Sequence, residues 1–235
     1  MHTGESPEYP SPQPPFNVSM TRPEPQRGRV IVLLGAESTG KTTLARELQA
    51  ALGAGGQSVA LVQEYLREFC DRHGRTPQHH EQSGIAREQA RRIAHAAADH
   101  DIVIADTSAL MVAVYSELVF ADPGLYASAL GAQAGYALTL LTALDLPWQA
   151  DGLQRDGVHV QAPVDALLRK ALAQAGLPFS VACGKGPQRL ANALAAARHA
   201  LALATDSPAE PATARWRWAC ERCGDADCER HRLPR

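Results

Sequence analysis

One stretch limits the possible fold more than any other. An apolar run, a glycine-rich turn and an amphipathic segment follow one another in Val30–Ala45, which reads VIVLLGAESTGKTTLA. The turn matches the pattern Gly-x-x-x-x-Gly-Lys-Thr, in which backbone N–H groups converge on phosphate oxygens. Its glycines permit backbone turns that a side chain would forbid, and the helix that follows adds its positive end. The stretch therefore predicts a strand, a phosphate-binding loop and a helix.

Further short apolar runs along the chain have the character of strands that are covered on both faces. These runs are Val59–Gln63, Ile102–Asp106, Tyr136–Leu141 and Phe179–Cys183. Helical patterns lie between them, for example in 41–52, where leucines recur every four residues. Strand and helix thus alternate about five times. We expect a three-layer α/β fold of the P-loop kinase-like type, with a five-stranded, mainly parallel sheet and right-handed crossovers.

The amino-acid composition is typical of one packed domain with a tail at each end. Of the 235 residues, 45% are hydrophobic and 20% are charged, which is enough apolar content for a packed core. We expect the domain over 28–204, a disordered proline-rich tail over 1–27, and a linker with a Cys/His-rich tail over 205–235.

The same numbers exclude several classes of partner. The net charge is −2, and the sequence shows no basic cluster of the kind that binds nucleic acid. No apolar run approaches the length of a membrane helix. The proline-rich start lacks the apolar segment of a signal peptide, so we expect a cytoplasmic protein whose ligands are small molecules.

The phosphate loop predicts ATP and Mg²⁺ as cofactors. Lys41 is expected to reach the β- and γ-phosphates, and the Thr42 hydroxyl to ligate magnesium. The expected nucleotide-binding residues are Gly35, Glu37, Ser38, Thr39, Gly40, Lys41, Thr42 and Thr43.

Two absences from the sequence narrow the chemistry. The segment after the fourth apolar run reads TLLTALDLPW, without the Asn-Lys-x-Asp pattern that reads guanine. The third run ends in Asp106 followed by Thr107, where many motor ATPases carry Asp-Glu and use the glutamate to activate water. Asp106 is thus a candidate magnesium-side carboxylate, and the missing glutamate favours transfer to a substrate hydroxyl over hydrolysis.

A small-molecule kinase needs further parts, and the chain offers a candidate for each. Glu64 closes the second run, where a carboxylate could take the proton of the acceptor hydroxyl; it could also be a solvated acid at a helix start. The segment 146–157, LPWQADGLQRDG, suits a lid that supplies Arg155, or else an ordinary surface loop. Gly184 and Gly186 follow the last run, where an adenine-holding loop is expected.

Taken in order, these motifs resemble a known family. The segments LLGAESTGKTTLA, QEYLREF, IADTSAL, LPWQADGLQRDG and GKGPQRLANAL are similar to the ribosylnicotinamide kinase domain of the bacterial bifunctional NAD-biosynthesis regulator and its stand-alone relatives. The likeness spans about 29–203. It implies ATP-dependent phosphorylation of nicotinamide riboside at its 5′-hydroxyl, which gives nicotinamide mononucleotide.

The resemblance also implies roles for single residues. Lys41 and Thr42 would hold ATP and magnesium, and Asp106 would stand near the metal or the substrate hydroxyl. The implied substrate-binding residues are Glu64, Tyr65, Arg67, Gln89, Asp106, Trp148 and Asp151. For two of them a structural interpretation stays open, since Tyr65 could be a core residue and Gln89 a residue of a helix surface.

The chain departs from the family pattern in the lid, which runs Asp-Gly-x-Arg in the family. Here Gln154 takes the place of the arginine and Arg155 follows it, a shift that turns a helical side chain by about 100°. The chain also lacks the His-x-Gly-His signature of the regulator's nucleotidylyltransferase, so we expect only the kinase module. The alternative from another class is a regulatory ATPase that drives a protein partner through the tails.

The C-terminal segment WRWACERCGDADCERHRL holds a candidate zinc site. Its possible ligands are Cys220, Cys223, Cys228 and His231. Three thiolates and an imidazole form a sound tetrahedral set, although free thiols or a redox pair are also open interpretations. The isolated Cys70 and Cys183 are expected to be buried apolar residues.

Overall fold

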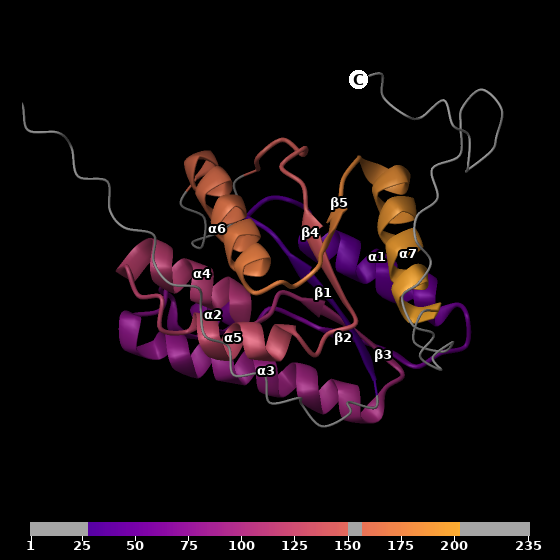
Figure 1. Cartoon of the computed structure of the whole chain (residues 1–235), viewed down its shortest axis with the longest axis horizontal. Helices are drawn as coiled ribbons and strands as arrows, with labels where there is room; N and C mark the ends of the chain where they lie inside the picture. Colours follow the sequence, from indigo (N-terminus) through magenta and orange to yellow (C-terminus); the bar gives the residue numbers. More distant parts are fainter. Residues whose placement is uncertain (1–27, 150–156, 203–235) are drawn as a thin grey trace, which may run out of the picture. The chain divides into compact units, whose positions relative to one another are not determined.

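The structure is a computed structural model that describes residues 28–149 and 157–202. Its sheet consists of β1 (Arg29–Leu34), β2 (Val59–Val62), β3 (Ile102–Asp106), β4 (Leu138–Thr142) and β5 (Ser180–Ala182). The strand order is β2-β3-β1-β4-β5, and all four pairings are parallel (Figure 1). This arrangement confirms the predicted α/β class and the five-stranded parallel sheet.

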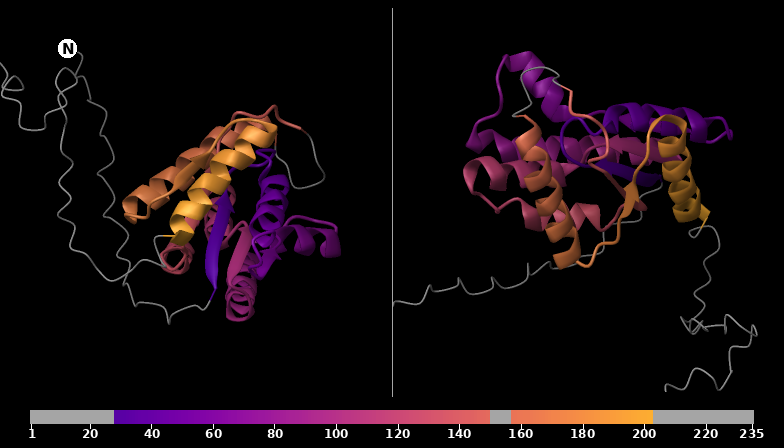
Figure 2. Two further views of the ribbon diagram at one scale, coloured as in Figure 1. Left: turned by 90° about the vertical axis from the view of Figure 1, so that its right-hand side faces the viewer. Right: turned by 90° about the horizontal axis from the view of Figure 1, so that it is seen from above.

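Helices cover both faces of the sheet (Figure 2). They are α1 (Lys41–Gly53), α2 (Tyr65–His73), α3 (Gln82–Asp99), α4 (Ala109–Phe120), α5 (Tyr126–Gln133), α6 (Gln161–Gln174) and α7 (Gly186–Ala202), with the 3-10 turns η1 (His79–Glu81) and η2 (Val158–Val160). Helices α1 and α7 pack with one face of the sheet, and α2 to α6 supply the core on the other. The expected three layers are therefore present.

The central strand β1 explains why the apolar runs are continuous. Val30, Val32 and Leu34 belong to the core on the side of α3 to α6, whereas Ile31 and Leu33 belong to the core beneath α1 and α7. Successive side chains of a strand point to opposite faces, so a strand with both faces covered needs an apolar residue at every position.

Most element boundaries lie within a residue or two of the expected ones. The fourth strand begins at Leu138, two residues later than expected, and continues to Thr142. Cys70 is buried as expected, but the expectation for Cys183 was wrong. It is exposed because β5 is a short edge strand that ends at Ala182, one residue earlier.

Other expectations fall outside the part of the chain that the structure describes. Both tails, with the candidate zinc ligands Cys220, Cys223, Cys228 and His231, lie there. Within 28–149 and 157–202, no helix is both long and apolar enough to cross a lipid bilayer.

Candidate active site

The phosphate loop joins β1 to α1 at the carboxyl edge of the sheet. Gly35 has a φ of 146°, and a Cβ at this position would lie 2.0 Å from the Oγ1 atom of Thr142 on β4. Gly40, with a φ of 74°, is the N-cap of α1. Both glycines of the motif are therefore required by the backbone, the first by close approach and the second by its left-handed conformation.

Two threonine hydroxyls hold the loop against the sheet. Thr39 Oγ1 donates to the carbonyl oxygen of Ala36 at 2.8 Å and lies 2.7 Å from Thr142 Oγ1. Thr142 Oγ1 in turn donates to the carbonyl oxygen of Leu34 at 3.1 Å. Both threonines are almost fully buried. The loop is thereby fixed to the ends of β1 and β4.

Lys41, Thr42 and Asp106 meet where β1 and β3 end side by side. The Thr42 hydroxyl donates to Asp106 Oδ2 at 2.5 Å, and Lys41 Nζ donates to the carbonyl oxygen of Ala36 at 2.7 Å. Asp106 is only 3% exposed, and its other oxygen, Oδ1, is buried without a hydrogen-bond partner among the described residues. A hydroxyl and a carboxylate with a spare oxygen are hard ligands of the kind that Mg²⁺ prefers. These two residues therefore fit the metal expected from the sequence.

The residue after Asp106 has an unusual backbone. Thr107 lies in the left-handed region with a φ of 76°, although it is neither glycine nor asparagine. Its N–H donates to the carbonyl oxygen of Leu33 at 3.1 Å. Such a conformation costs on the order of 1–3 kcal/mol and persists only where the surroundings enforce it. The turn that carries the Asp106 carboxylate is thus held in a defined shape.

A cleft of about 1820 Å³ opens over this edge of the sheet. It extends from the segment after β4 and the start of α7, over the phosphate loop, to the start of α2, η1 and α4. The predicted site residues that line it are Glu37, Ser38, Thr39, Gly40, Lys41, Thr42, Thr43, Glu64, Arg67, Asp106 and Gly186. The predicted site residues Gly35, Tyr65, Gln89, Trp148 and Gly184 belong to the described part of the chain but do not line the cleft.

Glu64 and Arg67 lie at the far end of the cleft from the start of α7. Glu64 follows β2 directly and is the N-cap residue of α2, with a half-buried side chain. Arg67 comes one turn later and is exposed. Both face the cleft from the strand end next to Asp106, because β2 is the neighbour of β3. Glu64 thus lies at a helix start, as one interpretation held, and in the cleft, as the other required.

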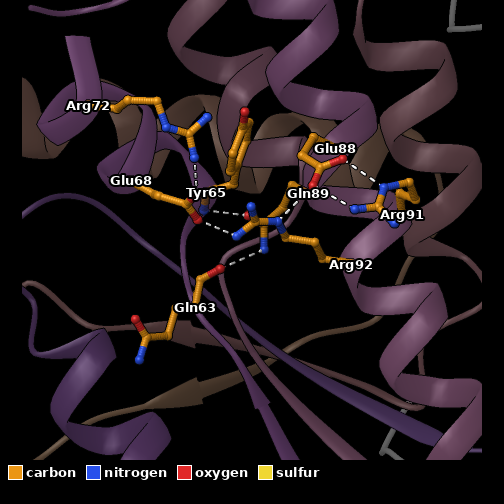
Figure 3. A network of polar contacts seen from close by, with 8 residues as sticks. All are labelled: Gln63, Tyr65, Glu68, Arg72, Glu88, Gln89, Arg91 and Arg92. Carbon is orange, nitrogen blue, oxygen red and sulfur yellow. Dashed lines mark hydrogen bonds and ion pairs between the residues drawn. The ribbon is translucent and has the colours of Figure 1, made fainter.

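Tyr65 at the start of α2 and Gln89 on α3 lie side by side (Figure 3). The Tyr65 N–H donates to Gln89 Oε1 at 2.7 Å, and the guanidinium of Arg92 lies 4.4 Å from the centre of the Tyr65 ring. Gln89 is 1% exposed, so it is not a residue of the helix surface. The Tyr65 ring packs against the core, which favours the core interpretation of this residue.

The same helices carry a network of ion pairs. Arg92 donates to Glu68 of α2 and to Glu88 of its own helix, and Arg91 also donates to Glu88 (Figure 3). Hydrogen bonds from Arg91 and Arg92 lower the pKa of Glu88 to about 2. The bond from Arg92 likewise lowers the pKa of Glu68. The pair between Arg92 and Glu68 joins α3 to α2, and the pairs of Glu88 lie within α3.

Arg189 of α7 is a site residue that the sequence analysis missed. Its guanidinium donates to the carbonyl oxygens of Thr39 at 2.8 Å and Gly184 at 3.0 Å, and to Asp145 Oδ1 at 2.6 Å. Burial by itself raises the pKa of Asp145, but the Gly184 N–H and Arg189 hold it below its usual value. Arg189 is 5% exposed and joins the phosphate loop to the loops after β4 and β5. The only signal in the sequence was an arginine one turn into an alanine-rich helix.

The expected lid is described only at its ends. Asp151 and Arg155 lie outside the described residues. At its start, the Gln149 N–H donates to Ser38 Oγ at 2.7 Å, so this end lies against the phosphate loop. Trp148 is half-buried, and its indole N–H has no hydrogen-bond partner in 28–149 or 157–202.

Solved structures that share this fold include two of NadR proteins. One is a NadR protein in complex with NR, with a TM-score of 0.60, 19% identity, and coverage of 79% of this chain and 53% of that one. The other is a NadR protein in complex with NAD and AMP-PNP, with a TM-score of 0.57, 19% identity, and coverage of 79% and 51%. The chain thus spans about half the length of each. No curated protein matches its sequence.

These likenesses confirm the predicted resemblance for the fold, which is all that 19% identity shows. The family match rests on the sequence. Residues 30–189, from the strand before the phosphate loop to the arginine that braces it, match the family AAA_28, described as an AAA domain. The chain therefore belongs to the AAA domain family of P-loop proteins.

Proposed function

We propose that this protein is an ATP-dependent nucleoside kinase that transfers the γ-phosphoryl group of ATP to the 5′-hydroxyl of nicotinamide riboside. The observation that carries the proposal is the extent of the cleft. It runs without interruption from the phosphate loop and Asp106 to Glu64 and Arg67. A phosphate donor and an acceptor can therefore bind side by side. The fold likeness to NadR structures with NR and with AMP-PNP supports this assignment.

On the donor side, the phosphate loop would hold the triphosphate of ATP. Lys41 Nζ, which donates to Ala36 of its own loop, would turn to the β- and γ-phosphates. Gly186, at the start of α7, would lie near the adenine. Thr42 and Asp106 would hold Mg²⁺, which when bound neutralises charge on the phosphate oxygens.

On the acceptor side, Glu64 would act as the general base. The oxygen of the acceptor hydroxyl forms a bond to the γ-phosphorus while its proton passes to the Glu64 carboxylate. The bond between the γ-phosphorus and the β–γ bridging oxygen breaks, and ADP leaves. Arg67, one helical turn from Glu64, would bind the nucleoside. Arg155 of the lid is proposed to stabilise the transferring group.

The test is ATP consumption by the purified protein with magnesium, with and without a panel of nucleosides that includes nicotinamide riboside. We expect stimulation by nicotinamide riboside, with nicotinamide mononucleotide as the product. Lys41→Ala should abolish turnover, and Glu64→Gln should lower transfer by about 10²–10⁴-fold. Asp99→Asn, at the far end of α3 and exposed, is the matched control and should leave transfer unchanged.

Turnover that is indifferent to every nucleoside would refute the kinase. The alternative function, a regulatory ATPase that acts on a protein partner, would then be favoured. Unchanged transfer in Glu64→Gln, with nicotinamide mononucleotide still formed, would remove only Glu64 from the mechanism.

A further inference from the structure

We propose that Gln89 of α3 is a positioning residue. Its buried amide ties the start of α2, which carries Glu64, to the end of β3, which carries Asp106. The inference rests on the proposed kinase function, because these two carboxylates serve the acceptor and the metal in that reaction. It replaces the expected role of Gln89, that of a direct contact to the substrate.

Within 28–149 and 157–202, the hydrogen bonds of the Gln89 side chain go to main-chain atoms beside these carboxylates. Its Oε1 accepts from the Tyr65 N–H at 2.7 Å, and its Nε2 lies 3.4 Å from the carbonyl oxygens of both Gln63 and Thr107. Gln63 and Tyr65 flank Glu64 on either side, and Thr107 follows Asp106. The two hydrogens of one amide group can serve two carbonyls at once. Both distances are longer than the usual range of about 2.7–3.2 Å. One side chain thus spans two strand ends.

The contact with Tyr65 serves as a helix cap supplied from another helix. The first N–H groups of a helix have no partner within it, and the N-cap side chain commonly accepts from one of them. In α2 the N-cap residue is Glu64, and its side chain makes no capping hydrogen bond among the described residues. Gln89 accepts from the Tyr65 N–H instead. The Glu64 side chain lines the cleft.

The contact with Thr107 acts on the other carboxylate. Thr107 has a left-handed backbone, and its N–H is already held by the carbonyl oxygen of Leu33. The Gln89 side chain, which comes from α3, donates to the carbonyl oxygen of Thr107. A strained residue keeps its conformation only when its neighbours determine it, so loss of this contact would let the turn after Asp106 relax.

The position of β2 makes such a tie valuable. In the described sheet, β2 is an edge strand and pairs only with β3. The ladder between them ends at Val62 and Ala105, before either carboxylate is reached. Beyond the last pair of the ladder, Gln89 connects the two strand ends through its contacts with the carbonyl oxygens of Gln63 and Thr107.

Arg92 strengthens the same attachment from outside. It lies three residues after Gln89 on α3, stacks on the Tyr65 ring at 4.4 Å and pairs with Glu68 (Figure 3). This side chain is 32% exposed, whereas Gln89 is 1% exposed. Salt should therefore weaken the outer contact but leave the inner one intact, because exposed ion pairs are screened and buried hydrogen bonds are not.

Two substitutions separate the halves of the Gln89 contact. Gln89→Met keeps the volume and removes every hydrogen bond, while Gln89→Glu keeps an acceptor for the Tyr65 N–H and loses the donors. We expect both to lower kcat by about 10- to 100-fold, the usual result of a small misplacement of reacting groups. The KM for ATP should change by less than about twofold, because Gln89 does not line the cleft.

A second measurement does not depend on activity. Hydrogen exchange at the Tyr65 N–H should become faster in Gln89→Met and stay slow in Gln89→Glu. Gln49→Met is the control, since this half-buried amide also donates to a main-chain carbonyl, that of Val59 at 3.2 Å, at the end of β2 away from Glu64. It should lower the melting temperature and leave kcat near the wild-type value.

The outcomes divide cleanly. Equal losses of kcat in Gln89→Met and Gln49→Met would overturn the inference and leave a purely structural glutamine. A kcat of Gln89→Glu equal to that of the wild type would also overturn it, because the Thr107 half would then be irrelevant. If the wild-type protein phosphorylates no nucleoside, the proposed function fails instead. Basal ATP turnover and Tyr65 exchange in the same variants then decide whether Gln89 positions Asp106.

Discussion

The brace formed by Arg189 can be tested by removing it. In Arg189→Met the side chain keeps most of its length but loses its charge and all its hydrogen bonds. The phosphate loop then loses its tie at Thr39, and Asp145 loses its charged partner. The Gly184 N–H still donates to Asp145, so this carboxylate keeps one of its two contacts.

The size of the effect follows from burial. The Arg189 side chain is 6% exposed and that of Asp145 is 32% exposed. Breaking a fully buried pair costs about 3–5 kcal/mol, and the partial exposure of Asp145 places this pair at the lower end, about 3 kcal/mol. In a domain of this size such a loss lowers the melting temperature by about 6–12 °C.

The assay is a double-mutant cycle read by urea and thermal unfolding. Asp145→Asn removes the charge that Arg189→Met leaves behind. We therefore expect the double variant to be more stable than Arg189→Met alone, by about 1 kcal/mol. Lys185→Met removes an exposed charge in the same loop and serves as the control, with a change of less than about 0.5 kcal/mol.

Additive losses would refute this reasoning. If the loss of stability in the double variant equals the sum of the losses in the two single variants, Arg189 and Asp145 do not act as a pair. If Arg189→Met is as stable as Lys185→Met, the contacts of Arg189 contribute nothing to the loop.

Further predictions concern the loop, the metal and acid stability. Gly35→Ala would place a Cβ 2.0 Å from Thr142 Oγ1 and should lower the free energy of unfolding by about 2 kcal/mol or more in urea titrations; unchanged stability would contradict the close approach. Asp106→Asn should raise the Mg²⁺ concentration for half-maximal turnover by about 10-fold or more, and an unchanged requirement would remove Asp106 as a ligand. The pKa of Glu88 is lowered from 4.5 to about 2, so the stability it contributes is present above pH 4.5 and lost as the pH falls towards 2. Unfolding titrations of the wild type and Glu88→Gln should therefore differ at pH 6 and converge in that window.

The sequence predicted the parts of the fold that short stretches determine. The β3 run, Ile102–Asp106, is apolar at every position until its last, because the strand is buried on both faces, and the strand has those bounds. The phosphate loop was equally local, since its glycines, lysine and threonine lie within eight residues. Helix α4 escaped prediction for the opposite reason. It packs against α3, α5 and α6 and is apolar almost all round, so no polar face marks its period.

The side chains that organise the site could not be found in the same way. Gln89 reaches Tyr65 across 24 residues, and Arg189 reaches Thr39 across 150. A glutamine on a helix and an arginine in an alanine-rich helix are common in sequences and predict no contact. The packing of α3 and α7 against the sheet brings these side chains to their partners. Glu64 was predictable because its place at a strand end is a local property, whereas its freedom from capping α2 is not.

The order of the strands bears on the choice between hydrolysis and transfer. The phosphate loop follows β1, Asp106 ends β3 and Glu64 comes two residues after β2, and these strands are adjacent in that order. Neighbouring strands lie about 4.8 Å apart, so the start of α2 stands about 10 Å from the end of β1. A base beside Asp106 would suit a water molecule close to the γ-phosphate, but the chain has Thr107 there, with its carbonyl held by Gln89. The cleft carboxylate one strand further away leaves room for a larger nucleophile between itself and the phosphate. This spacing favours an acceptor hydroxyl over water.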